Sequence, residues 1–405
     1  MARRLLPAAL AAAAVAGALA CVAPADAAVA TANLAPSSAQ GITIYGAGYG
    51  HGRGMSQYGA QGAAKKGLSS AKIVAFYYPG TTLAAKGNPT LRVRLSAIDN
   101  GHFTLVPTTG ATVSGVVATA GNGTKVSLPA RAKWHVARSG ANYVVQEPVT
   151  ATTWRTTYTL RAPVTFSGPS ALRVAYSKAK TDCRGGGSVT FAGSLQAAVS
   201  DNASRFLARM PIDTYLRGVV ASEMPSSWAP AALQAQTIAA RTYATAKITA
   251  SRYYDVIDTQ ANQCWDGQTS ETAATDAAIK ATAGKVLTVN GKPISAEFSS
   301  SNGGFTAPGG VGYLVSKADP YTSPTVWTKV VSPSALAALD GPLGLTTVTS
   351  VKVIKRSGGG RWGGRADAVQ LIGTKAGGKA ATASMTATSF RVKLDLKSNY
   401  LGFTQ

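Results

Sequence analysis

The sequence predicts an α+β fold, in which a helical core packs on β-hairpins and a small all-β module is inserted. Helical periodicity is confined to a few segments, of which the longest begins at Pro230. Short β-branched runs spaced about ten residues apart fill residues 91–176. Asn290-Gly291 separates two apolar runs, which is a strong signal for a hairpin. With 405 residues, of which 45% are hydrophobic and 14% charged, the chain can bury a sizeable core and is not wholly disordered.

The first 27 residues are typical of a secretory signal peptide. Arg3 and Arg4 precede an apolar stretch, and Ala25-Asp26-Ala27 supplies the small residues that a signal peptidase reads. We therefore expect a secreted mature chain; an uncleaved N-terminal anchor is the alternative. Beyond this segment no apolar run reaches the roughly 18 residues that a membrane span requires. Residues 28–40 are small and polar, which predicts a flexible lead-in.

Residues 41–85 form a glycine-rich block that we expect to pack on the larger domain. Glycine occupies every second position from Gly46 to Gly54. A short helix is predicted from Ser56 to Lys66, where Gly67 stops it. A second helix is capped by Ser69 or Ser70 and ends before Pro79-Gly80.

The remaining chain divides into two predicted parts. Residues 90–185 read as a small β-sandwich or barrel without a catalytic pattern. Residues 190–405 hold predicted helices at 213–220, 230–249 and 271–283. A hairpin of residues 286–289 and 294–298 follows, and strands surround the glycines at 358–360.

The charge of the chain points to an anionic partner. Lys and Arg number 40 against 17 Asp and Glu, which gives +23. Loss of the predicted signal peptide removes Arg3, Arg4 and Asp26 and leaves +22. Such a charge attracts anionic polymers over long range. No nucleic-acid motif accompanies it in a chain with a signal peptide, so we expect no nucleic-acid partner.

Only four glutamates are present, so the candidates for acid–base chemistry are few. Glu271 opens a predicted helix, which suits a capping residue. Glu147 lies in the β region, with no other chemistry near it. Glu297 alternates with serines along a predicted strand, opposite its apolar face, and we expect it to be solvated.

Glu223 differs because apolar residues surround it. It follows Val219-Val220-Ala221 and precedes Met224-Pro225, with Trp228 close by, at a bend between two predicted helices. Apolar surroundings raise the pKa of a carboxyl group, as protonation of a glycosidic oxygen near neutral pH requires. An ordinary glutamate at a helix end is the simpler interpretation of this local sequence.

Several long motifs resemble the SpoIID/LytB family, the proteins similar to stage II sporulation protein D. The central motif runs from Tyr215 to Trp228 and is followed by Ala232–Gln236 and Ala239–Ala244. Further similar blocks are residues 50–60, 77–81, 299–304 and 319–321 with Trp327, and residues 390–398 resemble the closing strand of the family. The resemblance covers roughly residues 41–85 and 190–405.

The resemblance implies a peptidoglycan lytic transglycosylase that acts on glycan strands stripped of their stem peptides. By position in the motif, Glu223 is the implied catalytic acid, and one carboxyl can serve both proton transfers of an anhydro-forming cleavage. The alternative is a non-catalytic protein that binds the cell wall and enhances a partner amidase. Either role implies location at the wall, with glycan strands and anionic wall polymers as partners.

The order of the motifs departs from the family pattern, since the block of residues 50–60 precedes the central motif. We therefore expect residues 46–60 to fold back beside Glu223, with His51 and Gln57 contacting substrate or lining its site. A glycine-rich structural turn with a helix cap is the alternative. Ser299, Ser300 and Ser301 are expected to line the same cleft, although a polar loop needs no function.

Two further expectations concern Arg241 and the cysteines. Arg241 shares a helical face with Gln234 and Ile238, so it can reach an acidic sugar substituent or form a buried ion pair with an aspartate. Some family members are thought to hold zinc near the segment around Cys264. Because Cys264 is the only cysteine in that segment, we prefer a disulfide with Cys183, with free thiols as the alternative. We expect no metal and no cofactor.

Overall fold

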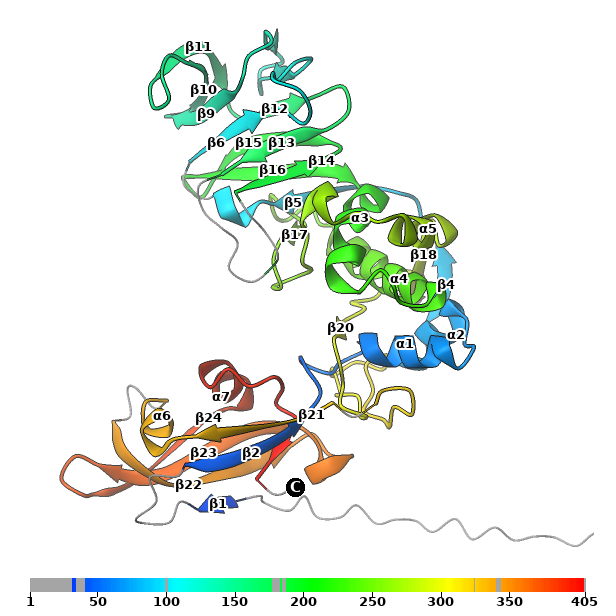
Figure 1. Cartoon of the computed structure of the whole chain (residues 1–405), viewed down its shortest axis with the longest axis vertical. Helices are drawn as coiled ribbons and strands as arrows, with labels where there is room; N and C mark the ends of the chain where they lie inside the picture. The colour runs from blue at the N-terminus through cyan, green and yellow to red at the C-terminus, as the bar shows by residue number, and fades with distance from the viewer. Residues whose placement is uncertain are drawn as a thin grey trace, which may run out of the picture.

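The computed structural model describes residues 31–33, 41–98, 101–176, 183, 187–323, 325–339 and 344–403. The predicted signal peptide, residues 1–27, and all of the lead-in except residues 31–33 lie outside this part of the chain. The described residues form six sheets. The predicted fold class, a helical core packed on hairpins, is therefore wrong, because strands dominate and most of the helices lie between two β regions (Figure 1).

The first β region is a sandwich of two antiparallel sheets whose alternating buried residues share one core. In spatial order, the six-stranded sheet contains β11 (Trp154–Arg161), β10 (Asn142–Pro148), β9 (Trp134–Ser139), β6 (His102–Val106), β13 (Leu172–Ala175) and β14 (Ser188–Phe191). The seven-stranded sheet contains β17 (Val256–Ile257), β5 (Thr90–Arg94), β16 (Ala203–Pro211), β15 (Ser194–Ser200), β12 (Val164–Ser167), β7 (Val117–Thr119) and β8 (Lys125–Ser127). Only β17 runs parallel to its neighbour.

This sandwich extends beyond the predicted module of residues 90–185. Strands β14, β15 and β16 continue it to Pro211, within the part of the chain that was assigned to the domain of residues 190–405. Its hydrophobic core is continuous with the first helix of the next region, since Tyr215 and Val219 belong to the same buried cluster as Phe206. The β module and helix α3 therefore share one hydrophobic core.

The five helices of the middle region begin and end near the predicted positions. They are α1 (Gln57–Lys65), α2 (Ser70–Tyr77), α3 (Ile212–Glu223), α4 (Pro230–Lys247) and α5 (Ala273–Ala281). Ser56 and Ser69 cap α1 and α2 with their hydroxyl oxygens, as Ser side chains commonly do. The cap of α5 is Thr272, so the interpretation of Glu271 as a capping residue is wrong.

The predicted hairpin is present, but its second strand is short. Strand β18 (Lys285–Val289) pairs with β19 (Lys292–Pro293) and with β4 (Thr82–Ala85). Asn290 and Gly291 have φ values of 50° and 72°, the left-handed conformation of a type I′ turn. The chain then leaves the hairpin, and β20 (Phe298–Ser299) pairs in parallel with β3 (Met55–Ser56). Phe298, which local alternation assigned to the hairpin, therefore belongs to a strand that pairs with residues distant in the sequence.

The C-terminal region contains two sheets, each joined by an N-terminal strand. One contains β1 (Thr31–Asn33), β22 (Leu345–Arg356), β23 (Ala366–Lys375) and β24 (Ala380–Thr386), and the other β21 (Val326–Val331), β2 (Ile42–Ala47) and β25 (Leu401–Gly402). Helices α6 (Pro333–Ala337) and α7 (Ala387–Lys393) pack on their shared core. The closing strand expected within residues 390–398 is wrong, since α7 occupies its first part and only β25 follows.

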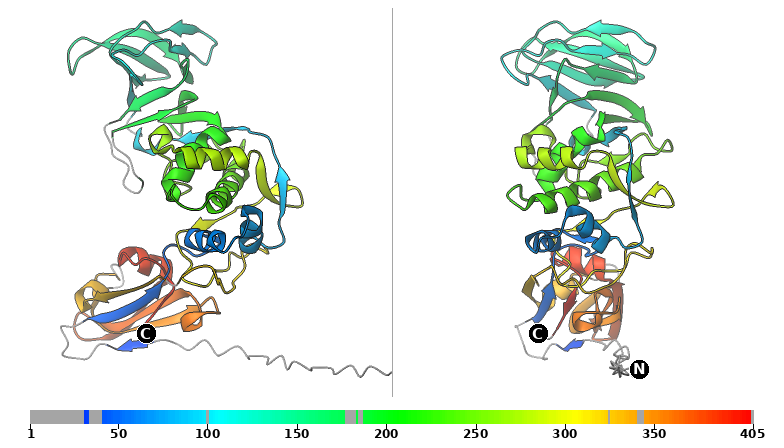
Figure 2. Two further views of the ribbon diagram at one scale, coloured as in Figure 1. Left: turned by 45° about the vertical axis from the view of Figure 1, so that its right-hand side comes forward. Right: turned by 90° about the vertical axis from the view of Figure 1, so that its right-hand side faces the viewer.

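Helices α1 to α5 lie between the β module and the C-terminal sheets in all three views (Figures 1 and 2). The blue α1 and α2 come from the N-terminal block, yet they pack beside the green α4. In the described part of the chain, none of the helices has both the length and the apolar character needed to cross a bilayer.

The shared core gives the first testable prediction. Phe206 lies 1% exposed in β16, with Phe103 and Tyr143 in edge contact with its ring. We expect Phe206→Ala to lower the free energy of unfolding by about 3–5 kcal/mol, because the truncation leaves a cavity in this core. Thermal unfolding followed by far-ultraviolet circular dichroism and by tryptophan fluorescence should show the β module and α3 melting together. Two well-separated transitions would contradict a continuous core.

Candidate active site

Glu223 is the last residue of α3, at the bend that leads to α4. The helix ends here because Met224 is extended, with φ −137° and ψ 135°, and Pro225 follows, which disfavours helical backbone in the residue before it. Met224 is buried and anchors the bend in the core that α1, α2 and α4 share. The Glu223 side chain is half-buried beside it. Local sequence therefore places this carboxyl at a fixed helix terminus.

The surroundings of Glu223 favour its neutral form. Burial raises the pKa of the carboxyl group above its ordinary value of 4.5, and the hydrogen bond from Cys264 and the nearby Gln57 amide oppose this shift in part. The backbone N–H of Cys264 donates to Glu223 Oε1 at 2.9 Å. The site thus holds a carboxyl that is a better proton donor near neutral pH than an exposed glutamate, with one fixed donor ready for the carboxylate.

The glycine-rich block folds back beside Glu223, as we expected for residues 46–60. The Tyr58 ring meets that of Trp228 edge-on, at a centroid distance of 5.0 Å. Gln61 Oε1 accepts a hydrogen bond from the backbone N–H of Ala229 at 2.9 Å. These two contacts fix α1 against the bend that follows Glu223.

The same block is joined to the segment that follows the hairpin. Tyr49 and Ser301 exchange both backbone hydrogen bonds, at 2.8 and 3.1 Å, and the backbone N–H of Gly52 donates to Ser299 Oγ at 3.1 Å. At Gly54, φ is 63°, and a Cβ atom would lie 2.0 Å from the carbonyl oxygen of Glu297. Only glycine permits this approach of two backbones.

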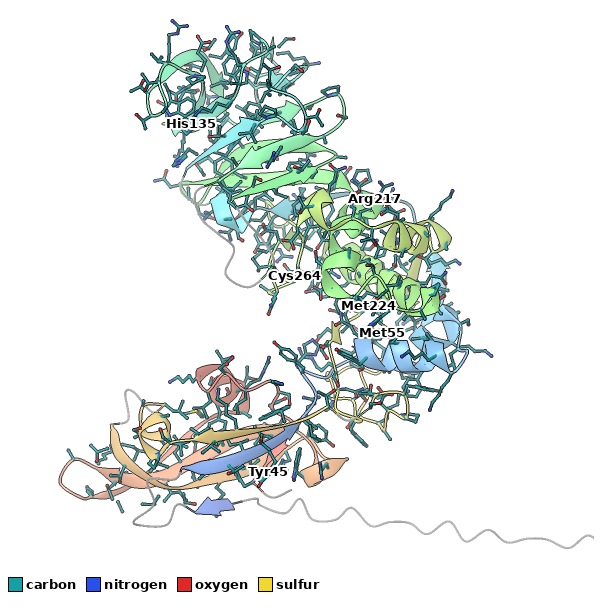
Figure 3. The ribbon with its side chains drawn as sticks, in the orientation of Figure 1. Tyr45, Met55, His135, Arg217, Met224 and Cys264 are labelled. Carbon is teal, nitrogen blue, oxygen red and sulfur yellow. A yellow bond between two sulfur atoms is a disulfide. The ribbon has the colours of Figure 1, made fainter. Side chains whose placement is uncertain are left out.

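An open cleft of about 490 Å³ results from these contacts. It brings together Glu223 with four of the residues predicted to contact substrate: His51, Gln57, Ser299 and Ser300. Tyr243 and Asn262 also line the cleft. The side-chain amide of Asn262 donates to the Tyr243 hydroxyl at 2.9 Å. Figure 3 labels Met224, which follows Glu223 in the chain, and Cys264, whose backbone N–H binds it, near the middle of the elongated molecule. The roles of these residues remain predictions.

His51 is held as a neutral imidazole. Burial, with the charges of Arg53, Arg365 and Arg391, lowers its pKa to about 3. Its Nδ1 accepts the backbone N–H of Arg53 at 3.0 Å, and a hydrogen bond to the backbone of Phe298 acts in the opposite direction on the pKa. His51 therefore suits a wall residue and not a proton carrier at neutral pH.

Two predicted substrate-contacting residues lie outside the cleft, and that prediction is wrong for both. Ser301 is 1% exposed and is used in pairing with Tyr49. Arg241 is also 1% exposed, and its guanidinium binds Asp213 at 2.9 Å and the Thr282 carbonyl at 2.8 Å. The alternative that the sequence left open, a buried ion pair, is the one found, because this face of α4 packs against α3 and α5.

Glu297 and Arg53 are cleft residues that the sequence did not single out. They form an ion pair at 2.5 Å, and both line the cleft. Alternation along a strand predicted a solvated Glu297, but the chain leaves the hairpin after Pro293 and pairs with the glycine-rich block instead. The Glu297 carbonyl accepts from the Tyr78 hydroxyl at 2.7 Å. The position of Arg53 inside the glycine-rich motif was the available signal.

The cysteines are paired in the structure. Cys183 and Cys264 form a disulfide, which ties a loop of the β module to the segment whose backbone binds Glu223. The Cys264 sulfur is therefore not available as a thiolate ligand for zinc. Within the described residues, no three His, Cys, Asp or Glu side chains gather as a metal site requires.

Comparison with known proteins finds similarity in the part of the chain that contains α3 to α5. Residues 200–289 match the family model of the stage II sporulation protein, SpoIID. The chain is 42% identical over 127 residues to the amidase enhancer of Bacillus subtilis (strain 168), covering 30% of this chain and 17% of that protein. It is 37% identical over 122 residues to the stage II sporulation protein D of the same organism, covering 26% of this chain and 35% of that protein.

These matches confirm the resemblance to the SpoIID/LytB family, and Glu223 lies inside the matched residues. The chain spans well under two thirds of the length of either relative. The activities that the relatives' names describe are therefore stated of those proteins alone.

Arg241 gives the second prediction. Arg241→Ala should lower the free energy of unfolding by about 3 kcal/mol, since it leaves buried carbonyl groups and Asp213 without their donor. Arg217→Ala is the matched control on α3, because Arg217 is about half exposed and its acidic neighbours lie 4.0 Å away. We expect the control to change stability by less than about 1 kcal/mol in denaturant unfolding. Equal effects of the two substitutions would contradict a structural role for Arg241.

Proposed function

We propose that this SpoIID-family protein is a secreted peptidoglycan lytic transglycosylase. It cleaves the MurNAc–GlcNAc bond of glycan strands stripped of stem peptides and leaves 1,6-anhydroMurNAc ends. The observation that carries the proposal is the Glu223 carboxyl, which has a raised pKa and lies on the wall of an open polar cleft. The charge of the chain, +23 over the whole sequence, suits an anionic wall.

The first step is proton transfer from neutral Glu223 to the bridging glycosidic oxygen. The C1–O bond of the muramic acid then breaks, and positive charge develops on its ring as an oxocarbenium ion. The proton leaves readily because the resulting carboxylate already has the N–H of Cys264 at 2.9 Å. Burial of the carboxyl favours its protonated form before substrate binds.

The second step returns the proton. The Glu223 carboxylate takes the proton of the muramic acid 6-hydroxyl, and that oxygen bonds to C1 to close the anhydro ring. No water is consumed, and Glu223 ends in its starting state. A single carboxyl therefore serves as acid and then as base, in contrast to hydrolysis by two carboxylates.

Glu297 is the other carboxylate of the cleft, and the two-carboxylate scheme needs it as a free base or nucleophile. Its ion pair with Arg53 at 2.5 Å occupies one of its oxygens, and this supports the single-carboxyl scheme.

The second candidate function is binding of the wall to enhance a partner amidase. The observation that favours it is the 42% identity to a protein named amidase enhancer. On this account the cleft binds the glycan, and the partner amidase performs the cleavage.

Substitution of Glu223 separates the two functions. Glu223→Gln keeps an oxygen for the Cys264 N–H but has no proton to donate, so cleavage should fall by about 10²- to 10⁴-fold while binding of glycan persists. Mass spectrometry of stem-stripped glycan after incubation measures anhydro ends. Glu271→Gln is the matched control outside the cleft and should cleave normally. Unaltered glycan with the native protein would support the binding function, and ends carrying an added water would support a hydrolase.

The pH dependence of cleavage should reflect the ionisation of Glu223. Because the folded-state pKa of Glu223 is raised above 4.5, its protonated form is favoured in the folded protein. The alkaline limb of the activity profile should therefore lie above pH 4.5. The linked contribution to stability is fully present below pH 4.5 and is lost as the pH rises through the folded-state pKa.

Melting temperatures across pH test the stability side of this linkage. Glu223→Gln should melt above the native protein at neutral pH, with the difference disappearing below pH 4.5. A variant that is less stable at every pH would contradict a buried carboxyl that is costly to ionise.

A further inference from the structure

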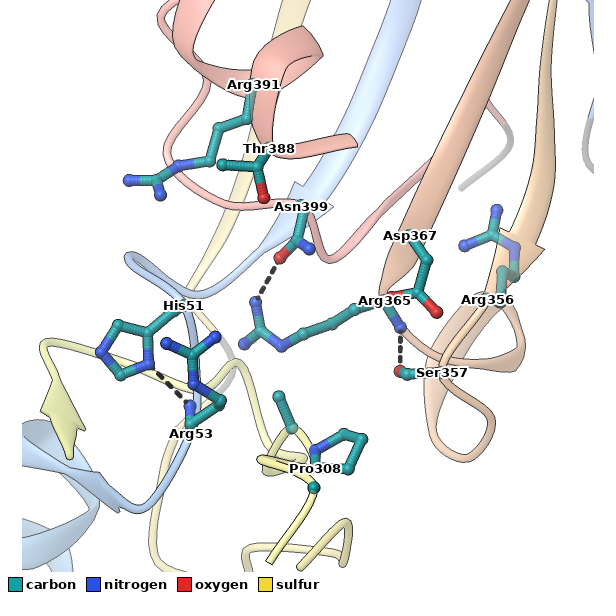
Figure 4. Close-up of a pocket in the computed structure, with 12 residues that line it drawn as sticks. His51, Arg53, Pro308, Arg356, Ser357, Arg365, Asp367, Thr388, Arg391 and Asn399 are labelled. Atoms are coloured by element: carbon teal, nitrogen blue, oxygen red, sulfur yellow. Dashed lines mark hydrogen bonds between the residues drawn. The ribbon is translucent and has the colours of Figure 1, made fainter. Parts of the chain in front are cut away.

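A second cavity, of about 620 Å³, opens beside the Glu223 cleft. Four arginines from separate parts of the chain line it: Arg53 of the glycine-rich block, Arg356 at the end of β22, Arg365 before β23 and Arg391 of α7. We call this cavity the arginine pocket. Figure 4 shows the side chains of Arg53, Arg365 and Arg391 around its His51 side, with Asn399 bonded to Arg365.

The positive charge of the arginine pocket is poorly compensated. Arg53 pairs with Glu297, but Arg356, Arg365 and Arg391 take part in no ion pair within the described part of the chain. Among the described residues, Asp367 is the one acidic residue that lines the pocket, where it is exposed, and the charge of Asp395 also acts on Arg391. Three guanidinium groups thus share a cavity without a bound carboxylate.

Arg365 is the most buried of these arginines, so an uncompensated charge costs the most free energy at this residue. It is 3% exposed and donates only to neutral oxygens, including the Asn302 carbonyl at 2.9 Å and Asn399 Oδ1 at 3.2 Å. Burial, together with Arg391 and Arg53, lowers its pKa to about 10. An isolated buried cation is expensive unless a counter-charge is present. A bound oxyanion would supply that charge and suits the planar, multiply donating guanidinium.

The arginine pocket is continuous with the cleft. His51, Arg53 and Arg391 line both cavities, so a polymer whose backbone lies along the cleft can place a side group in the pocket. The shared walls make the pocket an extension of the same binding surface.

We propose that the arginine pocket binds an oxyanion substituent, a carboxylate or a phosphate, of the glycan whose backbone occupies the Glu223 cleft. This inference rests on the proposed function for its substrate. Two sources carry such a group: the lactyl carboxylate of muramic acid and the phosphodiester of an anionic polymer attached to the glycan. The pocket thereby favours acidic glycan over neutral polysaccharide.

Thr388 allows a test that leaves the arginines in place. It lines the pocket, is exposed, and is the second residue of α7, where an acidic side chain is compatible with the helix. Thr388→Asp adds a negative charge at the pocket, and Thr388→Asn is its neutral control of nearly the same shape. Arg356→Gln removes a guanidinium that lines only the pocket, with exposed Arg161→Gln of β11 as its matched control.

Binding is measured in the Glu223→Gln background at low ionic strength, so that cleavage does not interfere. The ligands are stem-stripped glycan, the same glycan carrying a phosphodiester polymer, and inorganic phosphate alone, the last followed by its effect on the melting temperature. Relative to their controls, Thr388→Asp and Arg356→Gln should weaken glycan binding roughly three- to tenfold, and added salt should reduce the difference. The two substitutions should weaken binding more for the glycan that supplies the oxyanion, so comparison of the two glycans identifies its source.

Equal affinity of Thr388→Asp and Thr388→Asn for both glycans would overturn the inference, even if the native protein cleaves glycan as proposed. Conversely, phosphate that stabilises Thr388→Asn but not Thr388→Asp would support an oxyanion site even if no cleavage is found. The pocket and the proposed function can therefore fail separately.

Discussion

The structure depends on the backbone pairing between the glycine-rich block and the segment after the hairpin. Strands β3 and β20 pair in parallel, and Tyr49 pairs with Ser301, so residues about 250 positions apart become neighbours. On one side of this junction β2 enters the C-terminal sheet, and on the other α1 packs beside α4. The pairing therefore fixes the C-terminal sheets against the helices, and the cleft lies where the two meet. Close backbone approach at Gly54 makes glycine necessary there.

The second constraint is the cost of burying Glu223. The helix terminus holds the carboxyl where burial disfavours its charged form, and the backbone of Cys264 supplies one donor. The disulfide to Cys183 anchors that donor segment. A neutral side chain at this position would avoid the cost of ionising a buried carboxyl, and the function that we propose uses the proton of this glutamate.

The sequence was sufficient for the features that depend on local patterns. Serine caps, the Pro225 bend and the Asn290-Gly291 turn each act within a few residues, so the helices and the turn lie where they were predicted. The fold class was wrong because sheet membership depends on partners far along the chain, as the pairing of β2 with β21 and β25 shows. For the same reason Glu297 was assigned to solvent, and Arg241 remained undecided until the packing of α4 against α3 and α5 was known.

We propose that one carboxyl cleaves the glycan without consuming water, and cleavage in water enriched in heavy oxygen distinguishes this reaction from hydrolysis. Stem-stripped glycan is digested by the native protein in this solvent, and the new ends are weighed by mass spectrometry. If Glu223 returns its proton from the 6-hydroxyl, the new muramic acid ends are anhydro sugars without heavy oxygen. Reducing ends that carry heavy oxygen would contradict the account, because they require a water activated by a second base such as Glu297.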